Sequence, residues 1–576
     1  MNRLSRYLPI LQWGRTYDGT MLTSDFLAAV IVTTMLIPQS LAYAMLAGLP
    51  AEVGLYASIF PLVAYALFGT SRTLAIGPVA VVSLMSASSI SEVAAQGTAS
   101  YVEGALVLAL LSGFILLAMG LFRLGFLANF LSHPVISGFI TAAALLISAG
   151  QIGHIMGVKG RGDTLPEIVY ALAIQLGNVN PVTFAVGSLV LISLYASRKG
   201  LKPMLVMARM PARPAEIISR AAPLVTVAAT TLLATVFDLG AHGVALVGTI
   251  PAGLPSLGFP HISLDLIATL AMPACLISVV GFVESVSVAQ TLAAKRRQRV
   301  DPDQELIGLG AANVAAGLSA GYPVTGGLAR SVVNFEAGAA TPLAGAFTAV
   351  GIAVAAMYLT PLLSNLPRAT LAATIIVAVL SLVDFAAMRR VFLYSRSDFA
   401  AMAATLVVTL GRGVELGIVA GVLLSLLLHL YRTSRPHMAV VGQVRNTEHY
   451  RNVDRHSVAT WPEILSVRVD ESLYFANSRY LEDQIAEMVT NRPAVKHVVL
   501  MCSAVNAIDA SALESLDEVG RRLTESGIGF YLSEVKGPVM DRLKGTEFLS
   551  SLNGKVFLSQ HEAIQTLTKL EYEPSP

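Results

Sequence analysis

The sequence predicts a polytopic α-helical membrane protein followed by a small α/β domain. Of its 576 residues, 54% are hydrophobic and only 13% are charged, and the mean hydropathy is +0.66. Several apolar runs approach the roughly 20 residues that cross a hydrocarbon core. Near Arg435 the composition changes abruptly to short β-branched runs that alternate with amphipathic ones. We therefore expect a transmembrane domain over residues 1–435 and a cytoplasmic domain over residues 436–576.

The first domain is expected to contain about 14 spans with both termini in the cytoplasm. The first apolar run is too long to be a removable signal peptide and has no small-residue cleavage site. Lys and Arg gather in alternate short loops, which is typical of the cytoplasmic side of a membrane. We expect a multi-pass protein of a cell membrane, in bacteria the inner membrane. The clearest runs are Ser24 to Leu46, Val102 to Leu121, Ala221 to Phe237, Leu343 to Leu359 and Leu416 to Leu430.

Two segments interrupt the apolar pattern at comparable places in the two halves of this domain. They are Ile76 to Val82, which contains Gly77-Pro78, and Tyr322 to Ser331, which contains Arg330. A helix that begins inside a bilayer directs unpaired N–H groups and the positive end of its dipole at whatever lies in front of it. Irregular backbone at that depth is tolerated where protein buries it or where it lines a cavity. The pair predicts two structural repeats with an anion pocket between them.

A long ordered motif carries a family resemblance. It consists of Pro38-Gln39-Ser40-Leu41-Ala42-Tyr43-Ala44, then Pro50 to Ser58, Phe68 to Arg72 and Gly77-Pro78. This motif resembles the signature region of the SulP anion transporters, which include prestin, pendrin and plant sulfate transporters, and the C-terminal region resembles their STAS domain. The resemblance implies seven-plus-seven inverted repeats, a core domain that moves against a gate domain, and usually a homodimer.

The same resemblance implies a set of substrate-binding residues. In the family, the third and tenth helices meet head to head across the substrate, and Gln39 and Tyr43 share one face of the first helix, where an amide and a phenol can donate to an anion. Arg330 would supply positive potential without losing its proton. Ala329 replaces a serine of animal relatives, which leaves the substrate preference open. The implied positions are Gln39, Tyr43, Val79, Ala80, Val81, Leu328, Ala329, Arg330 and Ser331.

Glu284 is the second intramembrane charge that needs an explanation. Burial of a carboxylate favours its neutral form, so protonation of Glu284 could accompany the movement of an anion. Its position resembles the eighth-helix glutamate of proton-coupled relatives. A structural salt bridge to Arg330 is the alternative, and the two roles are compatible if the pair exchanges partners when substrate arrives.

The C-terminal region predicts a strand-helix alternation that is typical of a small α/β layer domain. At its centre, Asp509 or Ser511 can cap the helix that follows, because either side chain accepts from exposed N–H groups. Ser511 is also a candidate phosphorylation site, and we rank capping above it. A cytosolic partner of this domain is an alternative role. The expected strands are Ile464 to Val469, His497 to Met501, Gly529 to Leu532 and Lys555 to Leu558; the expected helices are Ser478 to Val489, Ser511 to Glu525, Pro538 to Leu543 and Glu562 to Leu570.

These features favour a proton-coupled secondary transporter, a symporter of sulfate or another small anion that works by alternating access. Sodium-driven bicarbonate uptake and dicarboxylate transport are alternatives, and an uncoupled anion channel or motor is an alternative of another class. A nucleobase permease is disfavoured by Arg330 and by the STAS-like region. The sequence offers no nucleophile-base pair, metal cluster or phosphate-binding loop, so we expect no enzyme activity, no metal and no cofactor. Nucleic acid is not an expected partner.

Overall fold

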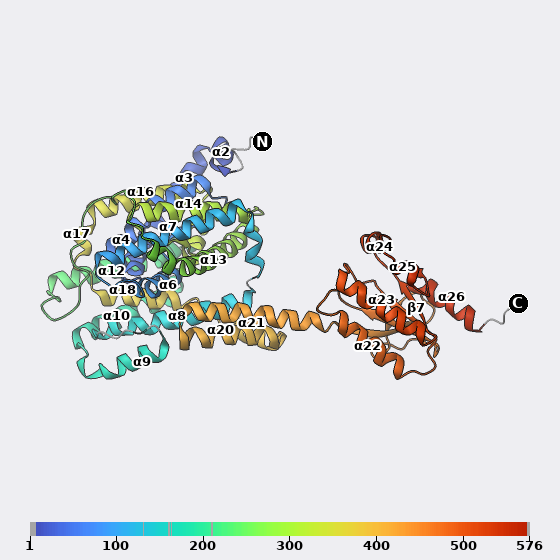
Figure 1. Cartoon of the computed structure of the whole chain (residues 1–576). Helices are drawn as coiled ribbons and strands as arrows, with labels where there is room; N and C mark the ends of the chain where they lie inside the picture. Colours follow the sequence, from blue (N-terminus) through green and yellow to red (C-terminus); the bar gives the residue numbers. More distant parts are fainter. Residues whose placement is uncertain (1–6, 131, 159–161, 163, 209–210, 573–576) are drawn as a thin grey trace. The chain divides into compact units, whose positions relative to one another are not determined.

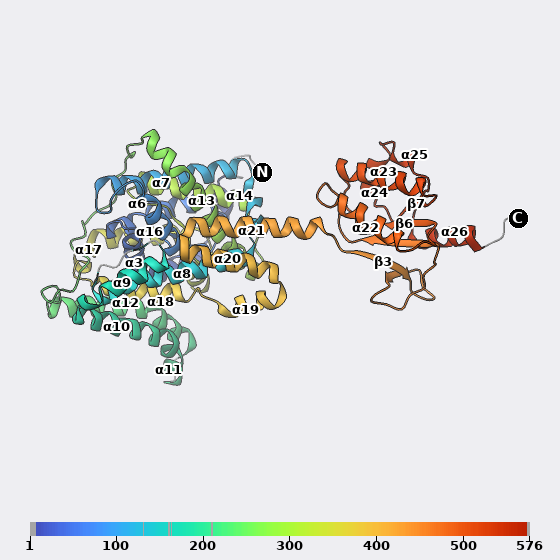
Figure 2. The same cartoon turned by 60° about the horizontal axis from the view of Figure 1, so that its bottom comes forward.

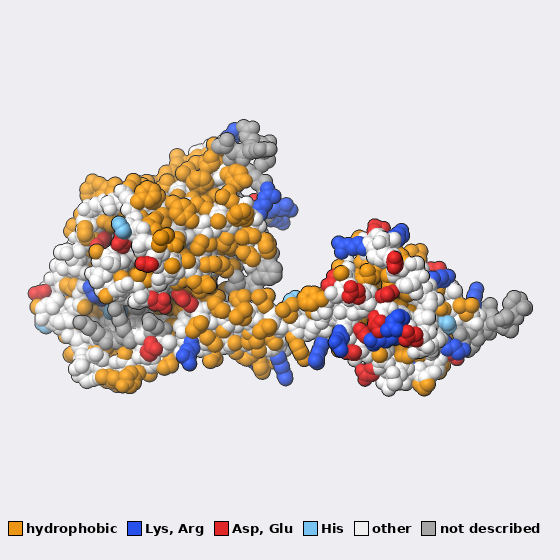
Figure 3. Space-filling view, viewed as in Figure 1, with side chains coloured by type: hydrophobic (Ala, Val, Ile, Leu, Met, Phe, Trp, Pro, Cys, Tyr) orange, Lys and Arg blue, Asp and Glu red, His pale blue; other side chains and the backbone are white. Residues whose placement is uncertain are grey.

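A computed structural model describes residues 7–130, 132–158, 162, 164–208 and 211–572. The chain divides into two compact units, Met1–Ser425 and Leu426–Pro576. Figure 1 shows that helices build the first unit, whereas the second contains a β-sheet. In the space-filling view, hydrophobic side chains form broad areas on the visible face of the first unit, and acidic and basic side chains gather on the second (Figure 3). The first unit therefore has the surface that a lipid environment requires.

Seven segments of the described chain are long and apolar enough to cross a membrane. Five shorter apolar helices, of 10–17 residues, accompany them. The fold is thus the expected helical membrane architecture. The seven segments are Gly19–Leu46, Ala51–Phe68, Ala99–Leu121, His133–Met156, Leu264–Lys295, Arg368–Tyr394 and Val414–Ser434, and the shorter helices are Ala80–Ser91, Leu165–Ile174, Pro181–Ala196, Leu224–Val236 and Leu343–Tyr358.

One succession of elements occurs twice in the first unit. A long helix, a second helix, a two-residue strand, a short helix and a further helix follow one another in each half, which agrees with the predicted duplication. The first succession is α3 (Gly19–Leu46), the broken span of α4 (Ala51–Tyr56) and α5 (Phe60–Phe68), β1 (Ile76–Gly77), α6 (Ala80–Ser91) and α7 (Ala99–Leu121). The second is α13 (Leu264–Lys295), α14 (Pro302–Leu318), β2 (Thr325–Gly326), α15 (Leu328–Glu336) and α16 (Leu343–Tyr358).

The helices of the first unit pack in two groups. In the first group, which we name the core bundle, α7 packs on α13 and α14, α14 packs on α5, α6 packs on α13, and α3 packs on α15 and α16. In the second, the gate bundle, α8 packs on α10, α18 and α20, and the first turns of α21 lie against α20. Figures 1 and 2 show the gate helices α8, α20 and α21 side by side. The gate helices are α8 (His133–Met156), α10 (Pro181–Ala196), α12 (Ala212–Val236), α18 (Arg368–Leu380), α20 (Arg396–Arg412) and α21 (Val414–Ser434).

The second unit is a six-stranded sheet in the order β4-β3-β5-β6-β7-β8. Strands β5 to β8 are parallel, and β3 is antiparallel to β4 and β5. Helices α22, α23 and α24 pack on one face and α26 on the other, because alternate residues of each strand point to opposite faces. The strands are β3 (Met438–Gln443), β4 (Tyr450–Asn452), β5 (Ile464–Val469), β6 (His497–Met501), β7 (Gly529–Ser533) and β8 (Val556–Phe557); the helices are α22 (Ser478–Thr490), α23 (Ala510–Glu525), α24 (Gly537–Leu543), α25 (Phe548–Ser551) and α26 (Gln560–Tyr572).

Candidate functional site

The two interrupted segments meet inside the core bundle. Strands β1 and β2 pair antiparallel, with Ile76 opposite Gly326 and Gly77 opposite Thr325. Helix α6 begins at Ala80, three residues after β1, and α15 begins at Leu328, two residues after β2. Because the strands are paired, the N-terminal ends of the two short helices come close together. The predicted opposition of two helix starts is therefore present.

Arg330 lies between these two helix starts. Its side chain extends from the first turn of α15 to the segment before α6, where Nη1 donates a 2.6 Å hydrogen bond to the carbonyl oxygen of Pro78. The residue is 2% exposed, yet Nε and Nη2 have no hydrogen-bond partner among the described residues. A buried cation with unpaired donors is costly unless an acceptor arrives. Arg330 is therefore ready to receive an anionic ligand.

Two glycines leave room for the guanidinium of Arg330. Gly77 has φ +145°, a conformation that side chains rarely adopt, and a Cβ there would lie 3.3 Å from Nη1 of Arg330. A Cβ on Gly327 would lie 2.9 Å from Nη2 of Arg330 and 3.2 Å from Cγ1 of Val79. The glycines that interrupt both segments thus create the space that the arginine occupies.

Polar side chains of the core bundle fix the strand pair. Ser331 accepts from the amide of Ala75 at 3.0 Å and donates to the carbonyl of Gly327 at 2.7 Å, so its hydroxyl already serves the backbone. Asn313 of α14 bonds both the amide and the carbonyl of Val324, each at 2.9 Å. These bonds hold the backbone that leads into α15. Ser331 therefore supports the backbone of the site, and its amide bonds the carbonyl of Gly327 at 3.0 Å; the predicted contact of Ser331 with an anion stays a prediction.

The predicted residues differ in their access to the surface. At the start of α15, Leu328 is 42% exposed and Ala329 is also exposed, whereas Val79, Ala80 and Val81 at the start of α6 are all buried. Gln39 is partly buried and Tyr43 is 8% exposed, both on α3, which packs against α15. The structure thus brings the start of α15 to an accessible surface and covers the start of α6. The predicted backbone positions are therefore not equally accessible in this conformation.

Tyr322 is a site residue that sequence reasoning missed. It is fully buried, and its hydroxyl pairs with that of Ser83 at 2.9 Å. Tyr322 and Tyr43 both lie close enough to Arg330 for a charge on one group to affect the other. Tyr322 begins the second interrupted segment. A tyrosine directly before Pro323 was the signal that could have identified it. Two phenols therefore accompany Arg330.

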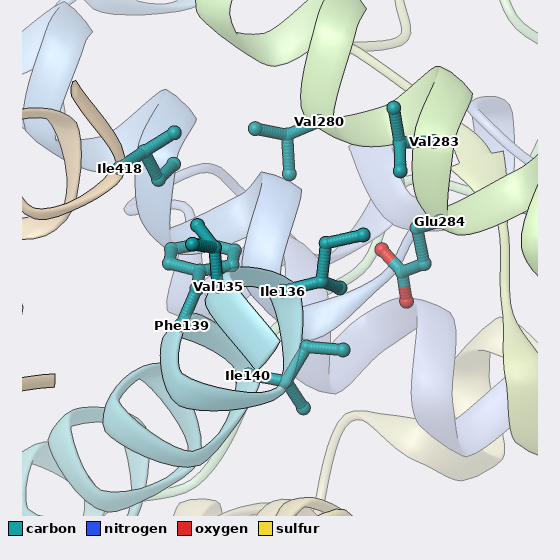
Figure 4. Close-up of a pocket in the computed structure, with 8 residues that line it drawn as sticks. All are labelled: Val135, Ile136, Phe139, Ile140, Val280, Val283, Glu284 and Ile418. Atoms are coloured by element: carbon teal, nitrogen blue, oxygen red, sulfur yellow. The ribbon is translucent and has the colours of Figure 1, made fainter. Parts of the chain in front are cut away.

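Glu284 of α13 faces a pocket between the two bundles. Its carboxylate lies beside Ile136 and Ile140 of α8, and Ile418 of α21 closes the opposite end (Figure 4). Glu284 is partly buried and interacts electrostatically with Arg330. Among the described residues, however, neither a hydrogen bond nor an ion pair joins the two side chains. The expected alternative of a direct salt bridge is therefore not formed in this conformation.

In the second unit, Asp509 caps helix α23. Its carboxylate accepts from the amide of Ala512 and from the amide of Phe475, both at 2.9 Å. Ser511 is exposed in the first turn of the same helix. The cap role thus falls to Asp509, and the Ser511 hydroxyl points to an accessible surface.

Comparisons with known proteins agree with this architecture. Residues 22–405 match the sulfate permease family and residues 456–563 match the STAS domain. The chain is 36% identical to sulfate transporter 4.1, chloroplastic, of Arabidopsis thaliana over 97% of this chain and 82% of that protein. It is 34% identical to a probable sulfate transporter of Mycobacterium tuberculosis over 96% and 97% of the two chains.

Solved structures share the fold at lower identity. The murine solute carrier 26 family member A9 anion transporter, in its inward-facing state, superposes with a TM-score of 0.86 at 22% identity, over 97% of this chain and 94% of that chain. The transmembrane domain of a cyanobacterial bicarbonate transporter gives a TM-score of 0.60 at 22% identity, over 70% and 98% of the chains.

Proposed function

This chain belongs to the sulfate permease family of membrane anion transporters, which are not enzymes, and on that premise we propose that it is a proton-coupled symporter of sulfate or a similar small anion. The observation that carries the proposal is the guanidinium of Arg330, which is buried between two helix starts and keeps two unpaired nitrogens. The arginine and both helix dipoles have the same sign of charge at this point. A small oxyanion would accept from all three, and an arginine can bind it through two parallel hydrogen bonds.

The hydrogen bonds of the buried carboxylates support a coupling role for Glu284. Asp25 accepts from the amides of Ala340 and Thr341 and from the Thr341 hydroxyl. Glu305 likewise accepts from several donors of the segment before β1. Both are thereby stabilised as structural acceptors. Glu284 has no such bond among the described residues, which leaves its carboxylate available for a proton.

We further propose the mechanism that the two bundles suggest. The core bundle, which carries both helix starts and Glu284, would move against the gate bundle and expose the anion alternately on the two sides. We also propose that the protein is a homodimer in a cytoplasmic membrane, with both termini in the cytoplasm. Its membrane domain would comprise residues 1–435 and its STAS domain residues 436–576. Phosphorylation of the exposed Ser511 would place negative charge at the start of α23, where the helix dipole favours it.

Counterflow in proteoliposomes tests the proposal. The panel is sulfate, bicarbonate, fumarate, succinate and chloride, with pH and sodium varied. We expect sulfate exchange that needs no sodium and net sulfate uptake driven by an inward proton gradient. Sodium-dependent bicarbonate uptake in place of sulfate exchange would refute this assignment. If sulfate never accumulates beyond the level set by its own electrochemical gradient, the protein is a channel.

Two variants test the assigned residues. Arg330→Ala should abolish measurable sulfate binding because the cation at the helix starts is lost, whereas Arg412→Ala, at the exposed end of α20, should bind as the wild type does. Glu284→Gln should retain binding and exchange but lose acid-driven uptake. Asp265→Asn, exposed on the same helix, is its matched control. Unaltered pH dependence in Glu284→Gln would remove Glu284 from coupling.

A further inference from the structure

Two buried hydroxyl groups tie helix α13 to strand β2. The Oγ of Ser285 lies 2.6 Å from Oγ1 of Thr325, and Ser285 accepts from the amide of Gly326 at 2.9 Å. Thr325 donates to the carbonyl oxygen of Gly281 at 2.7 Å. Ser285 is 0% exposed and Thr325 is 2% exposed. These four residues form one buried cluster, which we name the hydroxyl clamp.

The protons of the hydroxyl clamp can form one continuous chain. The Oγ of Ser285 also lies 2.6 Å from the carbonyl oxygen of Gly281, but a hydroxyl has one proton and can fully serve one acceptor. Ser285 can instead donate to Thr325 while Thr325 donates to Gly281. Each donor is then used once, because the amide of Gly326 serves Ser285. Hydrogen bonds in such a chain strengthen one another, so the clamp is a firmer link than separate contacts.

Glycines on both sides allow this close approach. A Cβ on Gly281 would lie 3.1 Å from Oγ1 of Thr325, and a Cβ on Gly326 would lie 3.0 Å from Oγ of Ser285. Non-bonded heavy atoms attract best at about 3.5–4.0 Å. A side chain at either glycine would therefore push α13 and β2 apart, and the clamp needs both glycines.

The hydroxyl clamp lies between the two charged groups of the proposed site. On α13, Ser285 directly follows Glu284, and successive residues of a helix point about 100° apart. Ser285 thus faces β2, while Glu284 faces the pocket beside α8 (Figure 4). On the other side of the clamp, Gly326 lies four residues before Arg330. The clamp therefore joins the segment that carries the carboxylate to the segment that carries the guanidinium.

The surroundings of Glu284 show why a fixed separation matters. Among the described residues, Arg330 of α15 and Tyr43 of α3 are the ionisable groups close enough for a charge on one group to affect the other. The pocket residues from α8 and α21 are apolar, and α6, α7, α14, β2 and the 3₁₀ helix Leu124–Phe130, which also pack on α13, contribute no ionisable group there. The Coulomb energy of two charges falls as their separation grows. Because no hydrogen bond joins Glu284 to Arg330, the clamp is the link that holds their segments together.

We propose that Ser285 and Thr325 are positioning residues that couple proton binding at Glu284 to anion binding at Arg330. A bound anion offsets the charge of Arg330 and so favours protonation of Glu284, and the effect is reciprocal. The clamp holds the two groups at the separation on which this coupling depends, and neither hydroxyl contacts the anion. This inference rests on the proposed proton-coupled function.

Four variants test the hydroxyl clamp. Ser285→Ala removes the acceptor for the amide of β2, Thr325→Val removes the donor to α13, and the double variant Ser285→Ala/Thr325→Val removes both. Thr325→Ser keeps the hydroxyl. The matched control is Ser112→Ala/Ser278→Ala. It removes a second buried hydroxyl pair, 2.8 Å apart, which joins α13 to α7 and has no hydrogen bond to β2 in the described chain.

The measurement is the Kd for sulfate of the purified full chain across pH, with the thermal unfolding midpoint in parallel. For the wild type we expect the Kd to fall at least about fivefold from alkaline to acidic pH, the usual lower limit of coupling between two sites. The double variant should still bind sulfate, because Arg330 keeps its bond to Pro78, but its Kd should change less than about twofold over the same range. Ser285→Ala and Thr325→Val should each give an intermediate response. Thr325→Ser and the matched control should respond as the wild type does.

Several outcomes would overturn the positioning role. One is a wild-type pH response in a folded double variant, and another is an equal loss of response in Ser112→Ala/Ser278→Ala. Loss of all sulfate binding in the folded double variant would also overturn it, because the two hydroxyls would then support the anion site itself. If the double variant does not fold, equal pH responses of Thr325→Val and Thr325→Ser would overturn the clamp. By contrast, a wild type whose Kd is independent of pH would refute the proposed proton coupling itself.

Discussion

Gly327→Ala places one methyl group against the proposed anion-binding arginine. Gly327 has φ −86°, so alanine fits the backbone without strain. The new Cβ, however, would lie 2.9 Å from Nη2 of Arg330, 3.1 Å from its Nε and 3.2 Å from Cγ1 of Val79. Nε and Nη2 are the two nitrogens of Arg330 that have no hydrogen-bond partner among the described residues. The methyl group therefore covers the donors that we assign to the anion.

The contacts of Arg330 allow the size of the effect to be worked out. The guanidinium is held on its other side by the 2.6 Å bond to Pro78, so it cannot withdraw freely. Overpacking of a filled interior costs about 1–3 kcal/mol. Because about 1.4 kcal/mol corresponds to a factor of ten, the lower half of this range predicts a Kd for sulfate about 5- to 30-fold higher than that of the wild type.

The assay is equilibrium binding of radiolabelled sulfate to purified protein, with the thermal unfolding midpoint measured in parallel. Gly345→Ala in α16 is the matched control, because its Cβ would meet only the carbonyl oxygen of Leu62, at 3.9 Å, and it should bind normally. Wild-type affinity in a folded Gly327→Ala variant would refute the assignment of Arg330 as the anion-binding group. A parallel loss in Gly345→Ala would attribute the effect to general packing.

Three further predictions concern stability. Glu305→Gln should lower the free energy of unfolding of the membrane domain by about 2 kcal/mol or more, seen as a lower thermal midpoint. The Glu305 carboxylate accepts four hydrogen bonds, and the amide replaces one of its two acceptor oxygens. An unchanged midpoint would contradict this. Asp509→Ala should destabilise α23 by about 1 kcal/mol in hydrogen-exchange measurements on the full chain, and Ser511→Ala should not. Partial burial of Asp470 acts to raise its pKa, but hydrogen bonds from Arg468 and His437 prevail and lower it below the ordinary value. The stabilisation that ionised Asp470 gives the fold is thus present above about pH 4 and is lost as pH falls through the lowered pKa. Asp470→Asn should therefore reduce the protection of β5 amides from hydrogen exchange at neutral pH and match the wild type in strong acid.

The sequence predicted the sheet of the second unit best where strands are central. The runs Ile464 to Val469 and His497 to Met501 coincide with β5 and β6 because both are buried on two faces and rich in valine, leucine and isoleucine. Strands β3 and β4 were not predicted. They lie at the antiparallel edge and mix exposed polar residues with buried ones, as Tyr450–Asn452 illustrates. A three-residue edge strand has too little periodicity to be recognised.

The site was predictable in its backbone and less so in its partners. Glycine, proline and an intramembrane arginine locate both helix starts from local sequence alone. The pairing of Ser83 with Tyr322 and the bonds of Asp25 to Ala340 and Thr341 join residues more than two hundred positions apart, so no local pattern reports them. A single acidic residue inside the first apolar run was nevertheless a signal that Asp25 must have buried donors.

The way in which the helices begin supports the proposed anion site. Five helices, α3, α7, α10, α13 and α14, are each preceded by a residue whose side chain accepts from the first amides of the helix. These residues are Asp18, Thr98, Asn180, Ser263 and Asp301. The residues that precede α6 and α15 are Val79 and Gly327, which have no side-chain acceptor. Helices α8, α16 and α18 also start without a side-chain cap, but of these helices α6 and α15 are the two that start beside Arg330. Free amides at a helix start need another acceptor, from water or a ligand.

The C-terminal end of α15, in contrast to its start, is bonded by side chains of the chain itself. Arg296 donates to the carbonyl of Phe335 at 2.7 Å and also to that of Ala339, while Asp25 accepts from the amides that follow. A cation at a helix C-terminus stabilises the dipole, so the end of α15 away from the site is neutralised and fixed by the chain itself. The start of α15 has no side-chain cap, and with Arg330 beside it this is the end that we propose to bind the anion.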